Sequence, residues 1–146
     1  MAPTRRPTID LLARVPLFAD LSRAHLSSLA GLAEEATYNP GRVIVQKGEP
    51  GRAFYVIVEG TAKVVKGKIV TARREAELGP GDFFGELALL DGEPRAATVI
   101  ADAPLTTIRI ERAAFRRLLR DEPGLATKLL EGMSRRTRKI LDTPAL

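Results

Sequence analysis

Hydrophobic and polar positions divide the chain into a helical segment, a strand-rich segment and a second helical segment. In the first segment, Thr8 is placed to cap a short helix over residues 9–15, and Pro16 marks a break. Ser22 is placed to cap a second helix. The apolar positions of that helix are Leu26, Leu29 and Ala33. We therefore predict N-terminal helices within residues 8–34.

Between residues 35 and 110 the pattern changes to short β-rich runs separated by turn residues. Turn sequences such as Asn39-Pro40-Gly41 supply the fixed or positive φ that a reversing chain needs. This spacing is typical of an all-β sandwich or barrel. The predicted strands cover residues 35–38, 42–45, 54–58, 62–65, 69–73, 76–78, 96–101 and 105–110.

Helical spacing returns in residues 111–142. One apolar stripe comprises Ala114, Phe115, Leu118 and Leu119. Pro123 is placed to start a last helix, and Gly132 in its middle costs about 1 kcal/mol relative to alanine. This last helix is interpreted either as a docked core helix or as a lid or dimer seam.

Composition limits the possible classes of function. The 146 residues, 45% of them hydrophobic, suffice for a single domain over residues 1–146. No apolar run approaches the roughly 18 residues of a membrane span, so we expect a cytoplasmic protein without a membrane segment. The chain has no cysteine and one histidine, His25, which disfavours metal-dependent enzymes such as cupins. We expect no enzymatic activity, catalytic residue, metal or cofactor.

The formal charge of +5 raises the question of nucleic acid. Basic residues concentrate in the C-terminal third, at Arg116-Arg117 and within residues 135–139. A solvated helix face is the favoured interpretation. No helix-turn-helix fits before Leu146, so no DNA-binding motif is expected.

The segment FFGELALLDGEPRAATV, residues 83–99, carries the candidate chemistry. A helical turn over residues 86–90, following Gly85, would point free N–H groups at an anion. Arg95 offers a planar fork for the oxygens of a cyclic phosphodiester, a contact of roughly 1.5 to 3 kcal/mol. Glu86 would accept a hydrogen bond from the ribose 2′-hydroxyl. Each residue alone has an ordinary structural explanation, but the ordered set matches the parts of one ligand.

The sequence resembles the cyclic nucleotide-binding domain of catabolite activator proteins, protein kinase A regulatory subunits and cyclic-nucleotide-gated channels. The resemblance covers roughly residues 16–141. Its motifs here are VPLFADLS, GEPG, FYVIVEG, LGPGDFFGE and PRAATV. It implies an antiparallel β-roll, similar to a jelly-roll barrel, flanked by N-terminal and C-terminal helices. The phosphate-binding cassette would lie within residues 35–110.

The resemblance also implies site residues. It assigns the ribose to Glu86, the phosphate to Arg95, and backbone contacts to the amides of Gly85, Leu87 and Ala96. Relatives that prefer cGMP often carry threonine or serine directly after the arginine, and Ala96 therefore favours cAMP over cGMP. The remaining predicted ligand contacts comprise Phe84, Ala88 and Ala97, the wall residues Val64, Val70 and Leu78, and two candidates from the last helix that would cap the base, Arg136 and Ile140.

We therefore expect a cyclic nucleotide sensor. Ligand contacts would order the cassette and draw the hinge around Phe115, with the last helix, over the base. The expected partners are the nucleotide and an unidentified protein effector, with a monomer or a homodimer through the C-terminal helix. Alternatives are a ligand-free protein interaction module on the same fold, or a regulatory fragment of a longer channel, kinase or transcription regulator.

Overall fold

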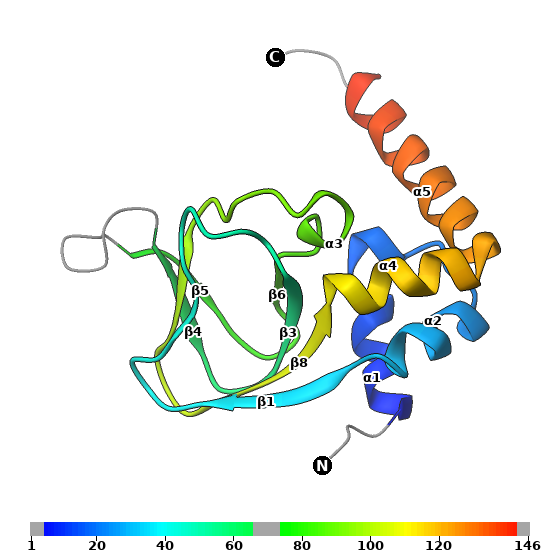
Figure 1. Cartoon of the computed structure of the whole chain (residues 1–146). Helices are drawn as coiled ribbons and strands as arrows, with labels where there is room; N and C mark the ends of the chain where they lie inside the picture. The colour runs from blue at the N-terminus through cyan, green and yellow to red at the C-terminus, as the bar shows by residue number, and fades with distance from the viewer. Residues whose placement is uncertain (1–4, 66–73, 143–146) are drawn as a thin grey trace.

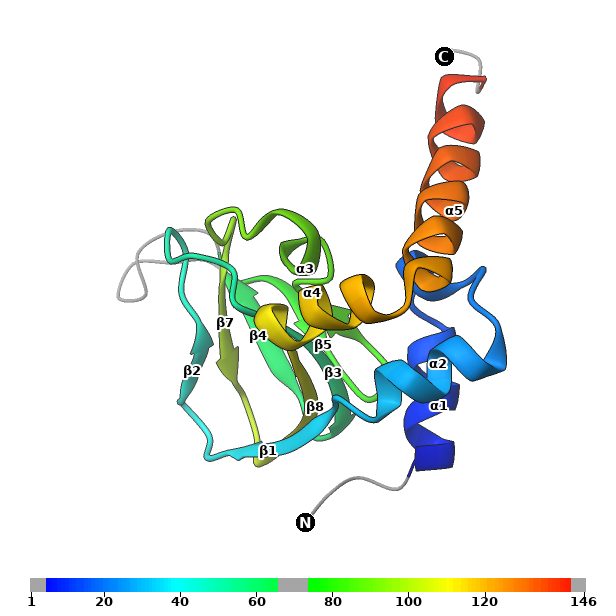
Figure 2. The same ribbon diagram turned by 45° about the vertical axis from the view of Figure 1, so that its right-hand side comes forward.

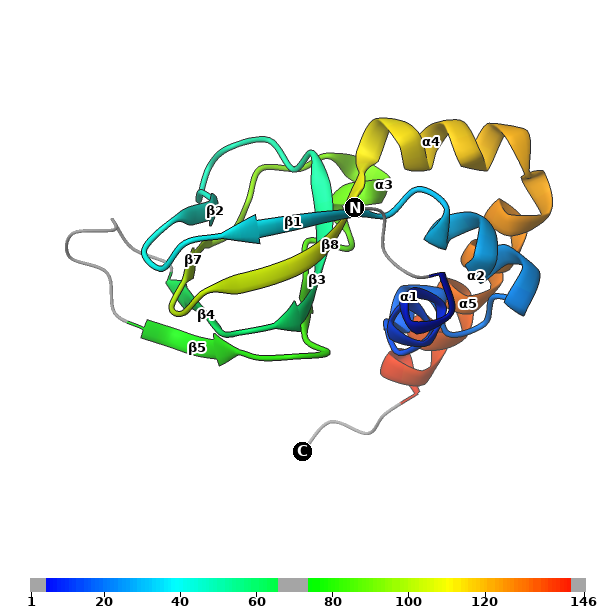
Figure 3. The same cartoon turned by 90° about the horizontal axis from the view of Figure 1, so that it is seen from below.

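The computed structural model describes residues 5–65 and 74–142 and places a β-roll beside a group of helices. Helices from both ends of the sequence lie on the same side of the roll (Figure 1). α1 (Arg5–Ala13) packs against α2 (Arg23–Ala30), and both lie on the same side of the roll as α5 (Pro123–Leu141) (Figure 3). The predicted order of helices, strands and helices is confirmed.

The roll consists of two four-stranded antiparallel sheets. The first sheet has the strand order β1 (Glu34–Tyr38), β8 (Leu105–Glu111), β3 (Ala53–Glu59) and β6 (Phe83–Phe84). The second has the order β2 (Val43–Val45), β7 (Thr98–Ala101), β4 (Ala62–Val65) and β5 (Arg74–Leu78). The antiparallel β-roll flanked by helices is confirmed. Within the described ranges no strand pairing joins the two sheets, so the roll is open and is not a closed barrel.

Strand positions follow the sequence pattern closely, with two departures and one prediction that the structure does not test. The predicted strand over residues 96–101 begins only at Thr98, which leaves Ala96 and Ala97 as loop residues. The two-residue strand β6 was not predicted because it is too short for an alternating pattern. The predicted strand over residues 69–73 lies outside the described residues.

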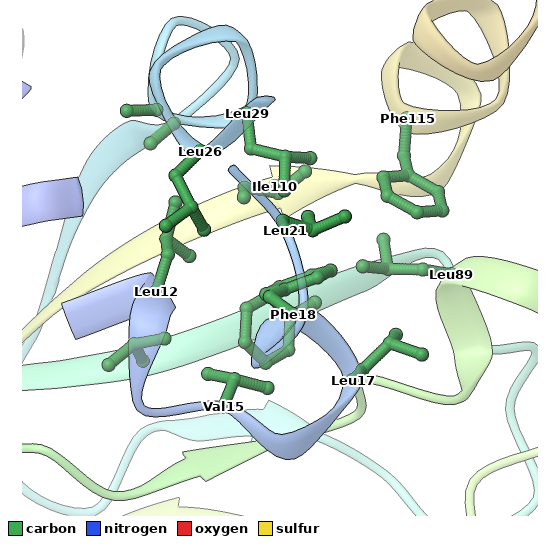
Figure 4. Packing of buried hydrophobic residues seen from close by; sticks show 14 of the residues in the cluster. Leu12, Val15, Leu17, Phe18, Leu21, Leu26, Leu29, Leu89, Ile110 and Phe115 are labelled. Carbon is green, nitrogen blue, oxygen red and sulfur yellow. The ribbon is translucent and has the colours of Figure 1, made fainter. Parts of the chain in front are cut away.

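Buried aromatic rings join the N-terminal helices, the first sheet and the C-terminal helices. Phe18 packs edge-on against Phe54 of β3, with ring centroids 5.7 Å apart, and lies 6.3 Å from the ring of Phe115. Leucines of the N-terminal segment, together with Leu89 and with Ile110 of β8, surround these rings (Figure 4). A second, smaller cluster fills the roll between the sheets and includes Tyr55, Ile57 and Val99. The first cluster therefore fixes the helices against the roll.

The N-terminal segment confirms one predicted cap and contradicts the other. Ser22 caps α2, and its hydroxyl accepts a hydrogen bond from the His25 N–H at 3.2 Å. The prediction that Thr8 caps α1 is wrong, because the helix begins earlier and Thr8 is buried inside it. Pro7 permits this start, since the first N–H groups of a helix have no partner within it. The predicted break occurs as a short 3-10 helix, η1 (Pro16–Phe18).

The chain leaves the first sheet directly into α4 (Arg112–Asp121), followed by α5. Phe115 fixes α4 against the core, and Leu125 and Leu129 bury the first half of α5. The second half of α5 projects away from the roll (Figure 2), and Ile140 is 74% exposed there. None of the helices in the described part of the chain is long and apolar enough to cross a membrane.

Candidate functional site

A cavity of about 400 Å³ lies between the second sheet and the segment that follows β6. Its lining combines apolar strand residues with the polar residues of the predicted cassette. The lining residues are Val45, Val64, Phe84, Gly85, Glu86, Leu87, Ala88, Asp91, Glu93, Pro94, Arg95, Ala96, Ala97 and Val99. Nine of the predicted contact residues are therefore brought together around one cavity.

Gly85 and Arg95 define the polar end of this cavity. Gly85 has a φ of +84°, a conformation that strains any residue with a Cβ. A Cβ at this position would also overlap Nη1 of Arg95 and lie 3.1 Å from the Ala53 carbonyl oxygen. Only glycine therefore leaves room for the guanidinium beside the turn.

The guanidinium of Arg95 is half-buried and holds a fixed position. Its Nη2 donates a hydrogen bond to the Ala53 carbonyl oxygen at 2.5 Å. Burial lowers the pKa of Arg95 from its usual value, and the charge of Tyr55 opposes this shift. Because a guanidinium keeps its proton well above neutral pH, the group stays cationic at neutral pH. No described carboxylate forms an ion pair with it, so its charge is available to an anion.

Backbone amides without a hydrogen-bond partner belong to residues that line the same cavity. The predicted helical turn begins later than expected, at α3 (Ala88–Asp91), and Glu86 and Leu87 form a turn before it. Among the described residues no acceptor receives a hydrogen bond from the N–H groups of Gly85, Glu86, Leu87 or Ala96. A concave set of free N–H groups favours an anion. The half-buried Glu86 side chain lines the cavity beside them.

Apolar side chains form the other end of the cavity. Val45, Val64 and Val99 come from three neighbouring strands of the second sheet. Phe84 closes this end from the first sheet, and its ring stacks on Tyr55 with centroids 4.9 Å apart. The cavity thus offers an apolar space next to a cationic one. Val45 and Val99 were missed in the sequence, because the short runs VIV of β2 and TVIA of β7 do not alternate between apolar and polar positions.

Three predicted residues lie elsewhere in this structure. Leu78 packs against the cluster inside the roll and does not line the cavity. Arg136 donates a hydrogen bond to Asp20 at 3.5 Å, and Ile140 is exposed on the projecting half of α5. Val70 lies outside the described residues. The cap over the base is therefore not assembled in this arrangement of α5.

The fold is an open antiparallel roll with helices at both ends, and its cavity is cationic at one end and apolar at the other. Together these two features define the class of small-ligand regulatory β-rolls. Residues 35–122 match the family model described as the cyclic nucleotide-binding domain. The chain belongs to this family, as its motifs predicted.

Named relatives extend this assignment. A cAMP-dependent protein kinase regulatory subunit from Hypocrea atroviridis is 37% identical over 136 residues. The match covers 93% of this chain but 27% of the relative, and the chain spans a similarly small share of the other curated relatives it matches.

Solved structures share the fold. The N-terminal domain of a transcriptional regulator from Streptomyces coelicolor superimposes with a TM-score of 0.82 at 32% identity, covering 94% of this chain and 99% of that one. A regulatory subunit of a cAMP-independent protein kinase A from Trypanosoma cruzi, bound to guanosine, gives a TM-score of 0.68 at 27% identity. That match covers 90% of this chain and 45% of the subunit. The same fold therefore occurs in regulators of different kinds.

Proposed function

We propose that the chain is a regulatory sensor that binds a 3′,5′-cyclic nucleotide, with cAMP preferred over cGMP. The observation that carries this proposal is the cavity in which the Arg95 guanidinium, free backbone amides and the Glu86 carboxylate meet beside an apolar wall. A volume of about 400 Å³ falls within the range of small-molecule sites.

The ligand would lie with its phosphate at the cationic end. Arg95 would donate two parallel hydrogen bonds to the exocyclic oxygens, and the amides near Gly85 would donate to the same group. Glu86 would accept from the ribose 2′-hydroxyl, which selects ribose over deoxyribose. The base would pack on Val64 and its neighbouring valines. Ala96 offers guanine no hydroxyl, which supports the preference for cAMP.

The signal in this proposal is the position of α5. The ligand would draw α4 and α5 toward the cavity, so that Arg136 or Ile140 reaches the base. A ligand shifts such an equilibrium only by its difference in affinity for the two arrangements, typically about 1 to 3 kcal/mol. The repositioned helix would act on a protein effector. The kinase regulatory subunit among the relatives makes a kinase one candidate effector.

Isothermal titration with cAMP, cGMP and guanosine tests the proposal. Wild-type protein should bind cAMP most tightly. The Arg95→Gln variant should bind about 10- to 100-fold more weakly, because a hydrogen bond to a charged group contributes about 1.5 to 3 kcal/mol. Arg42→Gln removes the same charge at an exposed position outside the cavity and should bind as wild type does.

The titration also separates the alternatives. Binding of guanosine without cAMP would place the chain with relatives that sense a nucleoside, and it would overturn the role given to Arg95. No binding of any of the three ligands would favour a ligand-free interaction module on the same fold.

A further inference from the structure

A second cavity, of about 710 Å³, lies against α4 and shares a wall with the first. Gly92 lines this second cavity, whereas its neighbours Asp91 and Glu93 line the first. The second cavity, which we call the arginine groove, is lined by six arginines. These are Arg52, Arg109, Arg112, Arg116, Arg117 and Arg120.

The packing of α4 explains why arginines gather there. Arg112, Arg116 and Arg120 follow one another at intervals of four residues, so they share one side of the helix over about 12 Å. Phe115 is fully buried on the adjoining side of the helix and fixes the rotation of α4. Arg52 reaches the same cavity from the turn before β3.

The positive charge of the arginine groove is poorly compensated. Arg109 pairs with Glu111 at 2.9 Å. No ion pair with a described carboxylate is formed by Arg52, Arg116 or Arg120. Like charges four residues apart on a helix are destabilising. This arrangement therefore costs the folded protein stability unless an anion is bound.

Arg112 packs against Gly92 and forms part of the groove wall. Its Nε is buried and has no hydrogen-bond partner in the described structure, although a buried donor without a partner is costly. The guanidinium lies directly over Gly92, where an added Cβ would come within 2.9 Å of its central carbon. The absence of a side chain at position 92 lets this arginine sit against the wall of the groove.

We propose that the arginine groove is a second ligand site, separate from the cyclic nucleotide cavity, for an anion that carries a chain of phosphate groups. A guanidinium matches phosphate oxygens with a planar pair of donors. The arginines come from the turn before β3, from β8 and from α4, so they surround a compact ligand and do not follow an extended acidic peptide. Inorganic polyphosphate and a nucleoside triphosphate share this chemistry.

Isothermal titration of the whole chain with inorganic tripolyphosphate, at about 0.15 M salt to screen exposed charges, tests this site. Saturable binding at one site is expected. The variant Arg116→Gln with Arg120→Gln should bind about tenfold more weakly or worse, the loss expected from one charged hydrogen bond. The control Arg42→Gln with Arg138→Gln loses the same charge at exposed positions outside the groove and should change affinity less than about twofold.

Two further titrations identify the class of ligand and locate its binding site. ATP that competes with tripolyphosphate for the groove would support the nucleoside form, and tripolyphosphate binding without ATP binding would support the inorganic form. Arg95→Gln should leave tripolyphosphate binding intact even where cAMP binding is lost, so this proposal and the cyclic nucleotide proposal can fail separately. Thermal melts of each variant confirm that it is folded.

Three results would overturn the proposal. One is the absence of saturable tripolyphosphate binding to the wild-type chain. Another is an equal affinity in the groove variant and the charge-matched control. A third is loss of tripolyphosphate binding in Arg95→Gln, which would place the anion in the first cavity. Where tripolyphosphate does not bind, saturable binding of an oligoglutamate peptide would assign the groove to an acidic protein segment.

Discussion

The carboxylate of Asp20 lies so close to Gly132 that a methyl group at position 132 would overlap Asp20 Oδ2. The same carboxylate pairs with Arg135 at 3.2 Å and with Arg136 at 3.5 Å. The turn after η1 is thereby joined to the middle of α5. The glycine that lowers helix propensity in the sequence is also the residue that admits Asp20 to the helix surface.

Removing this contact should ease the movement of α5. We expect Asp20→Ala to raise the affinity for cAMP by up to about fivefold, because exposed ion pairs contribute about 0 to 1 kcal/mol each. Isothermal titration measures this change. Asp10→Ala breaks a comparable exposed pair, with Arg23 at 4.0 Å, away from α5 and should leave the affinity unchanged. Equal affinities in the wild type and both variants would show that Asp20 does not oppose the movement.

Asp20 and Gly132 should be thermodynamically coupled. Alanine at position 132 gains about 1 kcal/mol of helix propensity, but in the wild type it must displace the Asp20 carboxylate. In an Asp20→Ala background the full gain should appear as increased free energy of unfolding. Urea unfolding of the four proteins in this double-mutant cycle measures the coupling. Additive changes would mean that the carboxylate moves aside without cost.

Gly85→Ala should damage ligand binding beyond its effect on stability. Alanine at a positive φ costs about 1 to 2 kcal/mol, and here it also displaces Arg95. Gly41 has a similar φ of +88° but open space around a Cβ, so Gly41→Ala carries the backbone strain alone. Both variants should lose similar stability by urea unfolding, whereas only Gly85→Ala should lose cAMP binding by titration. Loss of binding in both would assign the effect to strain.

Phe115→Ala should severely destabilise the fold. The ring extends from α4 and is fully buried near Phe18, and truncation of a buried phenylalanine costs about 3 to 5 kcal/mol. Leu141→Ala, on the exposed end of α5, should change the free energy of unfolding by less than about 0.5 kcal/mol. A small effect of Phe115→Ala in urea unfolding would show that α4 contributes little to the core.

Saturating cAMP should change hydrogen exchange in residues 111–141. If α4 and α5 move over the base, their amides should become more protected, most of all near Arg136 and Ile140. The Arg95→Gln variant, at the same cAMP concentration, controls for solvent effects. Unchanged exchange in this segment of the wild-type chain, measured with the ligand bound, would exclude the lid mechanism.

Local signals in the sequence predicted most elements correctly. Ser22 predicted the start of α2 correctly, because a capping contact lies within one helical turn. Pro123 predicted the start of α5 correctly, because proline favours the first position of a helix. The predicted cap at Thr8 was wrong, because threonine is also tolerated inside a helix. The strand β6 was not predicted, because two residues are too few to show an alternating pattern.

The sequence by itself determined the order of helices and strands, the family, and the set of residues around Gly85 and Arg95, since these depend on neighbours along the chain. Only the tertiary structure decided which distant residues meet. Val45 and Val99 complete the cavity through strand pairing, and Asp20 holds Arg136 across 116 positions of sequence. Such contacts depend on how whole elements pack, and packing is set by the shape of the complete core, which no local pattern encodes.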